Sequence, residues 1–433
     1  LASEMGISIK YEINSFPTNH ANTVRLALEG INGKKVQVQA ASLGGGSFEI
    51  QKIDDFDVNI SGDSYMLLLV DSRNQPVPEE LKALFPQPIT FFQTETSDGK
   101  LINIKTGYKI PDDIINKLKA IHAFDELIEI KPVMPVVSGN EKMLPYTSIS
   151  SMLDYADTNN MDLGDLGLIY EKCQSGLSDT ELLEKMQLII DTIETSILKG
   201  LAGTNYHDRI LHQQSHLVKI AQKEKRISGN TLLNDIVANV TAIMEAKSGM
   251  EVIVANPTAG SCGTVGGVLK AVADDLNSSK DEIIKAYFAA GIAGAYFAQG
   301  TGFSAEEHGC QVECGAASAM AAAAISQLFN VTARQSIDAA SMALQNQIGL
   351  ICDPVADRVE VPCLGKNVSA AMNALSSATM ACAGFDAVIP YDEVIQTVSK
   401  VSVQMPTCVK CTGLGGLAIT PTSVRLKKNL KTD

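Results

Sequence analysis

The stretch AASAMAAAAISQLF, residues 316–329, decides the fold of the C-terminal part of the chain. It is rich in alanine and apolar on most sides, which predicts a helix buried inside a bundle. It is well short of the roughly 18 apolar residues that a membrane span requires. Small residues recur in other segments, as in AAGIAGA at 289–295, and they allow neighbouring helices to approach closely. Residues 145–425 are therefore expected to form a compact, mostly helical domain with functional loops between buried helices.

A second segment of this region carries a clear helix start. Residues 180–190 have an apolar period of 3.6 residues, which predicts an amphipathic helix. Ser178 and Glu181 are spaced as a capping box, in which the side chain of each residue accepts a hydrogen bond from the backbone N–H of the other. The helix is therefore expected to begin at about this serine.

The N-terminal part has strand patterning instead. Residues 23–28 and 36–40 alternate between apolar and polar side chains on either side of the turn residues 29–33, which predicts a β-hairpin. Three glycines at 44–46 follow. Such a run either forms a flexible loop between strands or binds a small anion through its backbone N–H groups. Residues 1–55 are expected to form a strand-rich unit.

Residues 63–136 predict a third unit in the order strand, helix, strand, strand, helix, strand. Apolar strand runs lie at 65–70, 89–94, 101–104 and 127–130, and helices begin near Pro78 and Pro111. This βαββαβ order is that of a ferredoxin-like fold. Residues 132–135 contain two prolines and are interpreted as a linker. The whole chain is thus predicted to be α+β, with strand-rich units followed by a helical domain.

Composition excludes several functions. The 433 residues carry a net charge of −14, which disfavours nucleic-acid binding because that needs a basic face. No run of residues is long and apolar enough for a membrane span, and no signal peptide is visible, although the chain opens at Leu1 rather than Met. Nine cysteines, an odd number, argue against a disulfide scaffold and favour cytoplasmic thiols, some of them metal ligands.

Three cysteines stand beside residues that bend or loosen the backbone. Cys310 follows a glycine, and Cys352 and Cys363 bracket the segment CDPVADRVEVPC. Three thiolates presented on loops can hold an iron–sulfur cluster and leave one iron open as a Lewis acid. The alternative is that these are small buried hydrophobic residues, since no CxxC repeat marks them as a metal site. Spacing alone leaves both interpretations open.

Several motifs in order give a resemblance to the iron–sulfur-dependent L-serine dehydratases. Residues 145–425 resemble the α-type catalytic domain of this family through NPTAGSCG at 256–263, GCQVECG at 309–315, the 352–363 segment, GKN at 365–367, and GLGGLA with TPT at 413–422. Residues 1–55 resemble the end of the β-type domain of the family, and 63–136 resemble an ACT domain, which often binds amino acids. The proline–glycine step usual in ACT domains reads NQPV here, at 74–77, which puts effector binding there in doubt.

The resemblance implies a reaction and a cofactor. The family converts L-serine to pyruvate and ammonia with a [4Fe–4S] cluster, whose ligands by resemblance are Cys310, Cys352 and Cys363. Nothing in the sequence identifies a pyridoxal phosphate lysine, so that cofactor is not expected. Two alternatives remain: the same chemistry on L-cysteine or L-threonine, and a non-catalytic member that senses an amino acid.

Further site residues are expected around these ligands. Candidates for binding the substrate, a small amino acid, are Asn256, Thr258, Ser261, Gly263 and Asn367, and candidates for catalysis are Ser261 and Lys366. The glycine-flanked 256–263 loop suits a carboxylate at the start of a helix, whereas the alternative is that Gly260, Gly263, Gly266 and Gly267 only allow tight helix packing. Lys366 either holds a carboxylate or is a solvated charge.

Other cysteines and histidines have weaker signals. Cys408 and Cys411 form a CxxC, a second candidate for metal or redox chemistry, and Cys262, Cys314 and Cys382 are interpreted as core residues or neighbours of the site. His212 and His216 are spaced to bind a metal from one helical turn, but a polar helix face is the favoured interpretation. His308 lies close to Cys310, although the matching family position is usually apolar.

The Ser-Ser-Ser-His-Thr motif of the β-type domain is not found in this chain. The resemblance suggests a homodimer. The segment with this motif is either missing from this sequence, supplied by a second subunit, or not part of this protein.

Overall fold

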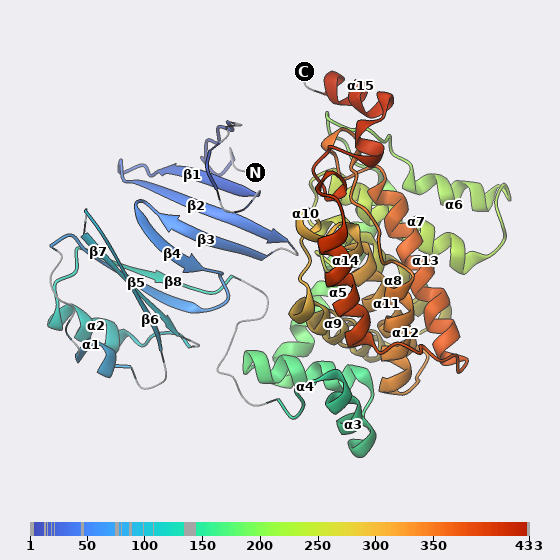
Figure 1. Ribbon diagram of the computed structural model, residues 1–433, viewed down its shortest axis with the longest axis horizontal. Helices are drawn as coiled ribbons and strands as arrows, with labels where there is room; N and C mark the ends of the chain where they lie inside the picture. Colours follow the sequence, from blue (N-terminus) through green and yellow to red (C-terminus); the bar gives the residue numbers. More distant parts are fainter. Residues whose placement is uncertain are drawn as a thin grey trace.

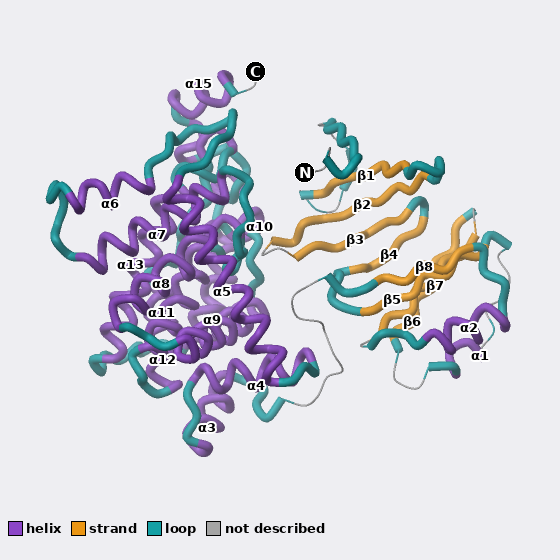
Figure 2. Tube along the Cα trace, turned by 180° about the vertical axis from the view of Figure 1, so that it is seen from behind, coloured by secondary structure: helices purple, strands orange, loops and turns teal. Residues whose placement is uncertain are grey.

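The chain folds into two β-sheets and a helical body (Figure 1). This computed structural model describes residues 4–430 apart from 13, 15, 19, 21, 45–46, 74–77, 79, 86–88, 98, 107 and 134–143. Two antiparallel sheets precede a mostly helical C-terminal part, so the α+β class predicted from the sequence is confirmed. Strand β2 ends and β3 begins close to the helical body, near the short helix α10 (Figure 2).

The first sheet is a meander of four strands in chain order. Its strands are β1 (Thr23–Glu29), β2 (Lys35–Gly44), β3 (Ser47–Ile53) and β4 (Phe56–Ile60). Leu26 pairs with Val38 across the first hairpin, so the alternating apolar residues of the two strands share one face. The hairpin predicted from the period-2 pattern is therefore confirmed, whereas two of the three glycines at 44–46 lie outside the described residues.

The second sheet has the strand order β6-β7-β5-β8 and carries two helices. Its elements are β5 (Tyr65–Asp71), α1 (Glu80–Ala83), β6 (Thr90–Thr96), β7 (Gly99–Thr106), α2 (Asp112–Ile121) and β8 (Glu126–Ile130). This is the βαββαβ order expected from the sequence. Two expectations stay predictions. One is that residues 63–136 act as an ACT domain, and the other is that the chain divides into domains at the boundaries expected from the sequence.

Strand β5 links the two small cores because its side chains alternate. Met66 and Leu68 pack against Phe56 and Ile60 of the first sheet. Leu67 and Leu69 point the other way, into a cluster with Leu118 of α2. A strand with both faces covered is expected to be apolar throughout, and the sequence YMLLLV at 65–70 is.

The helical body is built around α11 (Cys314–Leu328), all of whose residues are buried. Seven of its fifteen residues are alanine, so neighbouring helices can approach closely, as predicted from the 316–329 stretch. The other helices are α3 (Ile149–Asn159), α4 (Leu163–Ser175), α5 (Asp179–Ala202), α6 (Ser215–Lys223), α7 (Thr231–Ser248), α8 (Cys262–Leu276), α9 (Lys280–Gly300), α10 (Ala305–His308), α12 (Ala333–Gln345), α13 (Cys363–Cys382), α14 (Tyr391–Gln404) and α15 (Pro421–Asn429).

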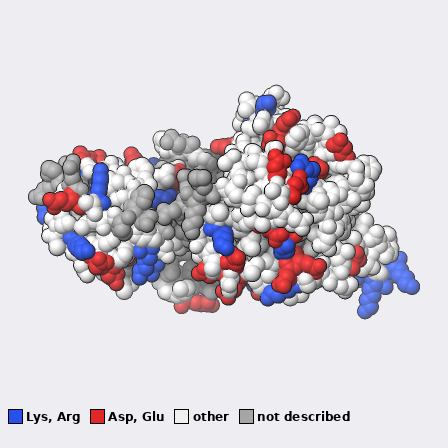
Figure 3. All heavy atoms as spheres, turned by 90° about the horizontal axis from the view of Figure 1, so that it is seen from below, with Lys and Arg blue, Asp and Glu red and all other residues white. Residues whose placement is uncertain are grey.

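Helix α5 starts where the sequence predicted. Ser178 is its N-cap, and its side chain accepts from the backbone N–H of Glu181 while the Glu181 carboxylate accepts from the backbone of Ser178 at 2.9 Å. This confirms the capping box. Among the described residues, no helix has both the length and the apolar character needed to cross a membrane. Acidic and basic side chains are interspersed on the face shown in Figure 3, with no broad basic patch.

Candidate active site

Two cysteines converge at one end of the helical body. Cys310 begins the 3₁₀ turn η2 (Cys310–Val312) between α10 and α11, and Cys352 lies in the loop after α12. Both are buried, with 2% and 3% of their surface exposed. Their sulfurs and a carboxylate oxygen of Glu313 all lie within 4.8 Å of one another, an arrangement that can hold a metal ion. This is the one such group found among the described residues.

The Cys310 turn is fixed by its neighbours in sequence. Gly309 has φ +76, and a side chain there would come within 2.8 Å of the Met405 sulfur, so glycine is needed. The backbone N–H of Gln311 donates to Leu350 O at 3.0 Å. The Gln311 side chain, fully buried, donates to Ser402 Oγ at 2.9 Å and accepts from the Gly349 N–H at 2.9 Å. These bonds hold the Cys310 turn against the loop that leads to Cys352.

The Cys352 loop pairs with a second loop. Cys352 donates its backbone N–H to Val409 O at 2.8 Å, and its own carbonyl accepts from the Cys411 N–H at 2.9 Å. Cys411 thereby comes next to Cys352, and both belong to one buried cluster with Cys310. Of the predicted CxxC pair, only Cys411 reaches the site, because Cys408 is exposed.

Asp353 joins the Cys352 loop to the GLGGLA motif. Its carboxylate accepts from Lys366 Nζ at 2.8 Å and from the Leu417 N–H at 2.9 Å. A side chain at Gly416, where φ is +57, would lie 2.6 Å from this carboxylate, which explains a glycine there. Lys366 also donates to Ile351 O at 2.7 Å. Lys366 is therefore not a solvated charge, because its two bonds connect α13 to the Cys352 loop. Its catalytic role stays a prediction.

Cys363 is the first residue of α13 and is also buried, with 5% exposed. It does not join the group of atoms within 4.8 Å, although it is close enough to Cys310 for the two thiols to interact electrostatically. Asn367, one turn along α13, donates to Cys363 O at 2.9 Å and to Gly260 O at 2.8 Å. Its Oδ1 accepts from Thr264 Oγ1 at 3.0 Å. Asn367 thus joins the third cysteine to the 256–263 loop.

The thiols around Cys310 influence one another's pKa. Hydrogen bonds from Cys314 and Cys352, helped by Lys366 and opposed by burial, hold the pKa of Cys310 well below its usual range. The same bond to Cys310, together with burial, raises the pKa of Cys314, and bonds to Cys310 and Cys411 raise that of Cys352. Burial raises the pKa of Cys363 to about 12. Cys314 is therefore a neighbour of the site, and Cys310 is the thiol whose ionisation this group favours.

Glu313 is the residue that sequence reasoning missed. Its carboxylate accepts from Thr258 Oγ1 at 2.6 Å and lies 3.8 Å from Cys310 Sγ, so it touches both the 256–263 loop and the cysteines. Burial, followed by the charge of Cys310, raises the pKa of Glu313 to about 8. Its one signal was an acid inside the GCQVECG motif, which no local pattern marks as buried.

The 256–263 loop leads into α8 through the 3₁₀ turn η1 (Ala259–Ser261). Thr258 caps this turn by accepting from the Ser261 N–H at 3.2 Å. The Ser261 hydroxyl is fully buried and bonds within the loop, to Thr258 and weakly to Asn256 O. Asn256 is buried and lines a separate apolar pocket beside α5 and α9. The predicted site residues of this loop are thus brought together, with Thr258 alone bonded directly to Glu313.

The glycines of this loop divide into two groups. Side chains at Gly263 and Gly267 would come within 2.6–2.9 Å of Val240 or Met244 on α7, and one at Gly266 would meet Ile193 of α5 at 2.6 Å. Tight helix packing, the alternative offered by the sequence, describes these three positions. Gly260 differs because a side chain there would lie 2.6 Å from the Glu313 carboxylate.

The remaining candidates lie apart from the cysteines or only beside them. Cys262 is buried against Met244 of α7, with 3.7 Å between their sulfurs, and Cys382 ends α13 away from the site. The interpretation of His212 and His216 as one helical turn is wrong, because α6 begins only at Ser215 and His212 belongs to the preceding loop. Burial lowers the pKa of His308, which ends α10 beside the Cys310 turn.

One contact joins the N-terminal sheet to the site region. Asn22, just before β1, donates from Nδ2 to Glu306 Oε1 at 2.9 Å. Glu306 belongs to α10, four residues before Cys310. This contact connects the chain just before β1 to the helix that precedes the cysteine turn, and Figures 1 and 2 show the end of β2 close to α10.

A buried group of thiols and one carboxyl, held by loops between close-packed helices, defines a helical domain with a candidate metal centre. The particular family follows from comparison with known proteins: the chain belongs to the serine dehydratase alpha chain family, whose model matches residues 106–418.

Curated relatives agree with this assignment. The chain is 35% identical over 286 residues to a probable L-serine dehydratase, alpha chain, of Bacillus subtilis, a match that covers 66% of this chain and 95% of that protein. It is 32% identical over 284 residues to the L-serine dehydratase, alpha chain, of Peptoniphilus asaccharolyticus, covering 64% of this chain and 96% of that protein. L-serine dehydratase 1 of Escherichia coli is 29% identical over 291 residues, 65% of this chain and 64% of the relative.

Proposed function

We propose that the chain catalyses the conversion of L-serine to pyruvate and ammonia, as an ammonia-lyase. The observation that carries this proposal is the convergence of Cys310, Cys352 and Glu313 within 4.8 Å. The group lies beside the 256–263 loop, to which Thr258 connects it. Membership of the serine dehydratase alpha chain family supports the choice of substrate.

The residues fit a [4Fe–4S] cluster held by Cys310, Cys352 and Cys363. All three are buried cysteines from separate segments, namely the η2 turn, the loop after α12 and the start of α13, and cysteine thiolates are the usual ligands of such clusters. No fourth thiol is needed, because an iron without a protein ligand would supply a Lewis acid for the serine hydroxyl and carboxylate. Cys314 and Cys411 are then neighbours that bond to the ligands rather than ligands themselves.

The reaction requires a proton acceptor and a departing hydroxide. One proton leaves Cα, the C–O bond at Cβ breaks, and the products are water and aminoacrylate, which after tautomerisation takes up water and releases ammonia to give pyruvate. Glu313 is the carboxyl that contacts both the 256–263 loop and Cys310, so we assign to it the contact with the reacting part of the substrate. A carboxyl so placed can hold the transferred proton.

Other residues position these groups. Lys366 and Asp353 fix the Cys352 loop, and Asn367 fixes Cys363 relative to the loop that contains Ser261. Ser261 and Asn367 use their polar atoms inside the protein, which supports a positioning role for both. Gly260 leaves the space that the Glu313 carboxylate occupies.

The alternatives and partners remain proposals of the same kind. L-cysteine or L-threonine would undergo the same elimination, and a non-catalytic amino-acid sensor would keep the fold. Relatives named as alpha chains support a second subunit, and the contact between Asn22 and Glu306 marks a β-type segment beside the site. A homodimer and a cytoplasmic location, where thiols stay reduced, complete the proposal.

An anaerobic reconstitution tests the function. The protein is purified without oxygen, supplied with iron and sulfide, and assayed for pyruvate from L-serine, L-cysteine and L-threonine alongside iron content. About four irons per chain with pyruvate from L-serine is the expected result. A bound cluster with no pyruvate from any of the three amino acids would contradict the reaction, and an absence of iron would contradict the cofactor.

A further inference from the structure

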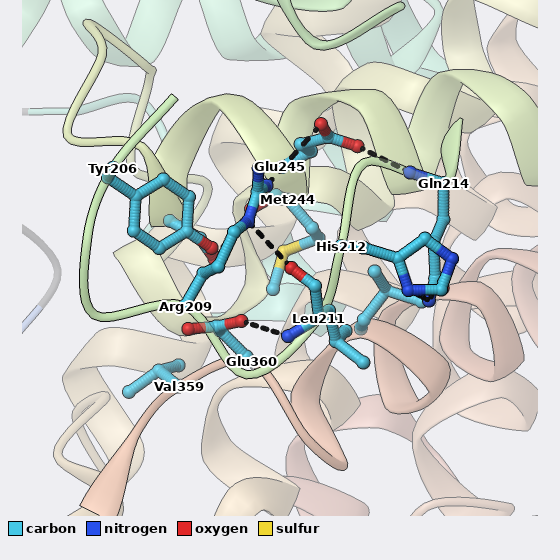
Figure 4. A pocket seen from close by; sticks show the side chains of 11 residues that line it. Tyr206, Arg209, Leu211, His212, Gln214, Met244, Glu245, Val359 and Glu360 are labelled. Atoms are coloured by element: carbon cyan, nitrogen blue, oxygen red, sulfur yellow. Dashed lines mark hydrogen bonds and ion pairs between the residues drawn. The ribbon is translucent and has the colours of Figure 1, made fainter. Parts of the chain in front are cut away.

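An open cavity lies between the loop after α5, the end of α7 and the segment before Cys363. Its lining includes Tyr206, Asp208, Lys247, Arg358 and Glu360. A smaller pocket adjoins it and shares Tyr206 and Glu360 (Figure 4). None of the site residues predicted from the sequence lines either cavity.

The acidic groups of this region already have partners. Asp208 pairs with Arg358 at 2.6 Å. Glu360, 5% exposed, accepts from the backbone N–H groups of Ile210 at 3.1 Å and Leu211 at 2.9 Å. Figure 4 shows Glu360 directed toward Leu211, and Arg209 directed toward the second buried carboxylate, Glu245. These bonds hold the 204–214 loop in place as one wall of both cavities.

Lys247 is different. Its Nζ donates to the backbone carbonyl of Val359, and within the described part of the chain it forms no ion pair with a carboxylate. An ammonium group has three N–H donors, so one bond leaves two unused. A half-buried cation with unused donors is costly unless a ligand or water meets them. Lys366, by contrast, has both a carboxylate and a carbonyl partner.

The position of Lys247 brings it to the candidate active site. It lies three residues after Met244, whose sulfur is 3.7 Å from Cys262 Sγ, and residues three apart share one face of a helix. Its partner Val359 lies four residues before Cys363. Burial lowers the pKa of Lys247, while Cys262, Cys363, Glu360 and Glu313 are near enough to act in the opposite direction. The ammonium therefore belongs to the cavity wall, where it is bonded to the segment that leads to Cys363.

We propose that Lys247 binds the carboxylate of the amino-acid substrate, and that the cavity it lines is where the substrate enters. The inference rests on the proposed function and deepens it by naming the group that recognises an α-carboxylate. Selectivity follows, because an amino acid is bound through this charge and an amino-acid amide is not.

The test compares Lys247→Met and Lys247→Arg with the unaltered protein, each reconstituted anaerobically. Steady-state kinetics give kcat and KM for L-serine. Calorimetry gives the Kd of L-alanine, which has the carboxylate but no leaving group, and of L-alaninamide. We expect Lys247→Met to raise both the KM for L-serine and the Kd of L-alanine by about 10- to 100-fold, the value of a charge-assisted hydrogen bond. Iron content and the Kd of L-alaninamide stay unchanged, and Lys247→Arg is intermediate.

The controls separate this role from a structural one. Lys270→Met removes a lysine from the outer side of α8, where it pairs with Asp274 at 2.5 Å, and is expected to change neither constant. If Lys247→Met keeps its affinity for L-alanine within about threefold, or loses iron while that affinity is unchanged, Lys247 only ties down the Val359 segment and the proposal is wrong. If the unaltered protein binds L-alanine through Lys247 but forms no pyruvate, the proposed reaction fails and the carboxylate site stands.

Discussion

The helical body and the N-terminal sheets bury their apolar residues to very different extents. Every residue of α11 is buried, and polar side chains such as Gln311 and Asn367 are fully buried with hydrogen-bond partners. On β1 of the first sheet, the alternating residues Val24, Leu26 and Leu28 are 48%, 43% and 52% exposed. The helical body thus surrounds its loops with packed and hydrogen-bonded side chains, whereas the first sheet leaves the apolar side chains of its edge strand β1 partly exposed. Equivalent substitutions should therefore have unequal effects in the two regions.

The largest effect is expected at the cysteines of the body. Cys352→Ala should abolish both the absorbance of the cluster and pyruvate formation, because it removes one of three ligands. Cys408→Ala, in an exposed position of the CxxC, is the matched control and should change neither. Absorbance spectra and iron content after anaerobic reconstitution measure the outcome. A full cluster in Cys352→Ala would show that the ligand assignment is wrong.

The second largest effect is expected for Glu313→Gln. Its kcat should be lower by about 10²- to 10⁴-fold, which is the usual contribution of a positioned proton acceptor. Iron content should stay the same, because the amide keeps the size of the side chain and can still accept from Thr258 Oγ1. Glu313→Asp, which retains the carboxyl, should recover part of the activity. Equal kcat values for Glu313→Gln and the unaltered protein would show that Glu313 takes no part in the reaction.

The difference between Cys352 and Glu313 also shows how far the sequence predicts the site. The α11 helix, the start of α5 and the βαββαβ order depend on local periodicity and caps, and they were predicted correctly. The carboxyl of Glu313 accepts a hydrogen bond from Thr258, which lies 55 positions away in the sequence. The local sequence around Glu313 does not indicate that contact. The same is true of Lys247, which reaches Val359 across 112 positions.

The roles of the residues that the sequence singled out depend on contacts between elements. Lys366, weighed as a ligand-binding group or a solvated charge, pairs with Asp353 and connects α13 to the Cys352 loop. Gly263 packs against α7, and its role toward the substrate stays a prediction. In both cases the residue type was informative and its role depended on which element packed against it.

Packing in the body can be tested at the crossing of α5 and α7. A side chain at Gly200 would lie 1.9 Å from Ala242 O, so Gly200→Ala forces the two helices apart. We expect a loss of about 3 kcal/mol in the free energy of unfolding, the upper part of the usual range for overpacking. Gly291→Ala, where the added methyl meets nothing, is the control. Denaturant midpoints compare the two, and equal values would contradict tight packing at this crossing.

In the sheets, one buried polar contact makes a testable contribution to stability. Asp71, at the end of β5, accepts from His122 Nε2 at 2.6 Å, and both side chains are buried. Burial acts to raise the pKa of Asp71, but hydrogen bonds from His122 and Arg73 outweigh it and lower the pKa. Asp71→Asn should cost about 1 to 2 kcal/mol at neutral pH, measured by hydrogen–deuterium exchange of β5.

The pH dependence of this pair has a definite sign. A carboxyl with a lowered folded-state pKa stabilises the fold above its unfolded pKa of about 3.9, and that stability is lost as pH falls through the folded value. The protection of β5 in the unaltered protein should therefore decline below about pH 4, whereas Asp71→Asn lacks this decline. An unchanged difference between the two proteins at pH 3 would contradict the assignment.

The smallest effect is expected at the uncovered edge of the first sheet. Leu26→Ser should change the free energy of unfolding by less than about 0.5 kcal/mol, because a substitution at an exposed surface position removes little burial. The control is Leu68→Ser on β5, 1% exposed between the two sheets, which should cost several-fold more. Denaturant midpoints give both values. A loss at Leu26 comparable with that at Leu68 would mean that another surface covers β1 in solution, and the contrast between body and sheets would then belong to the isolated chain rather than to the assembled protein.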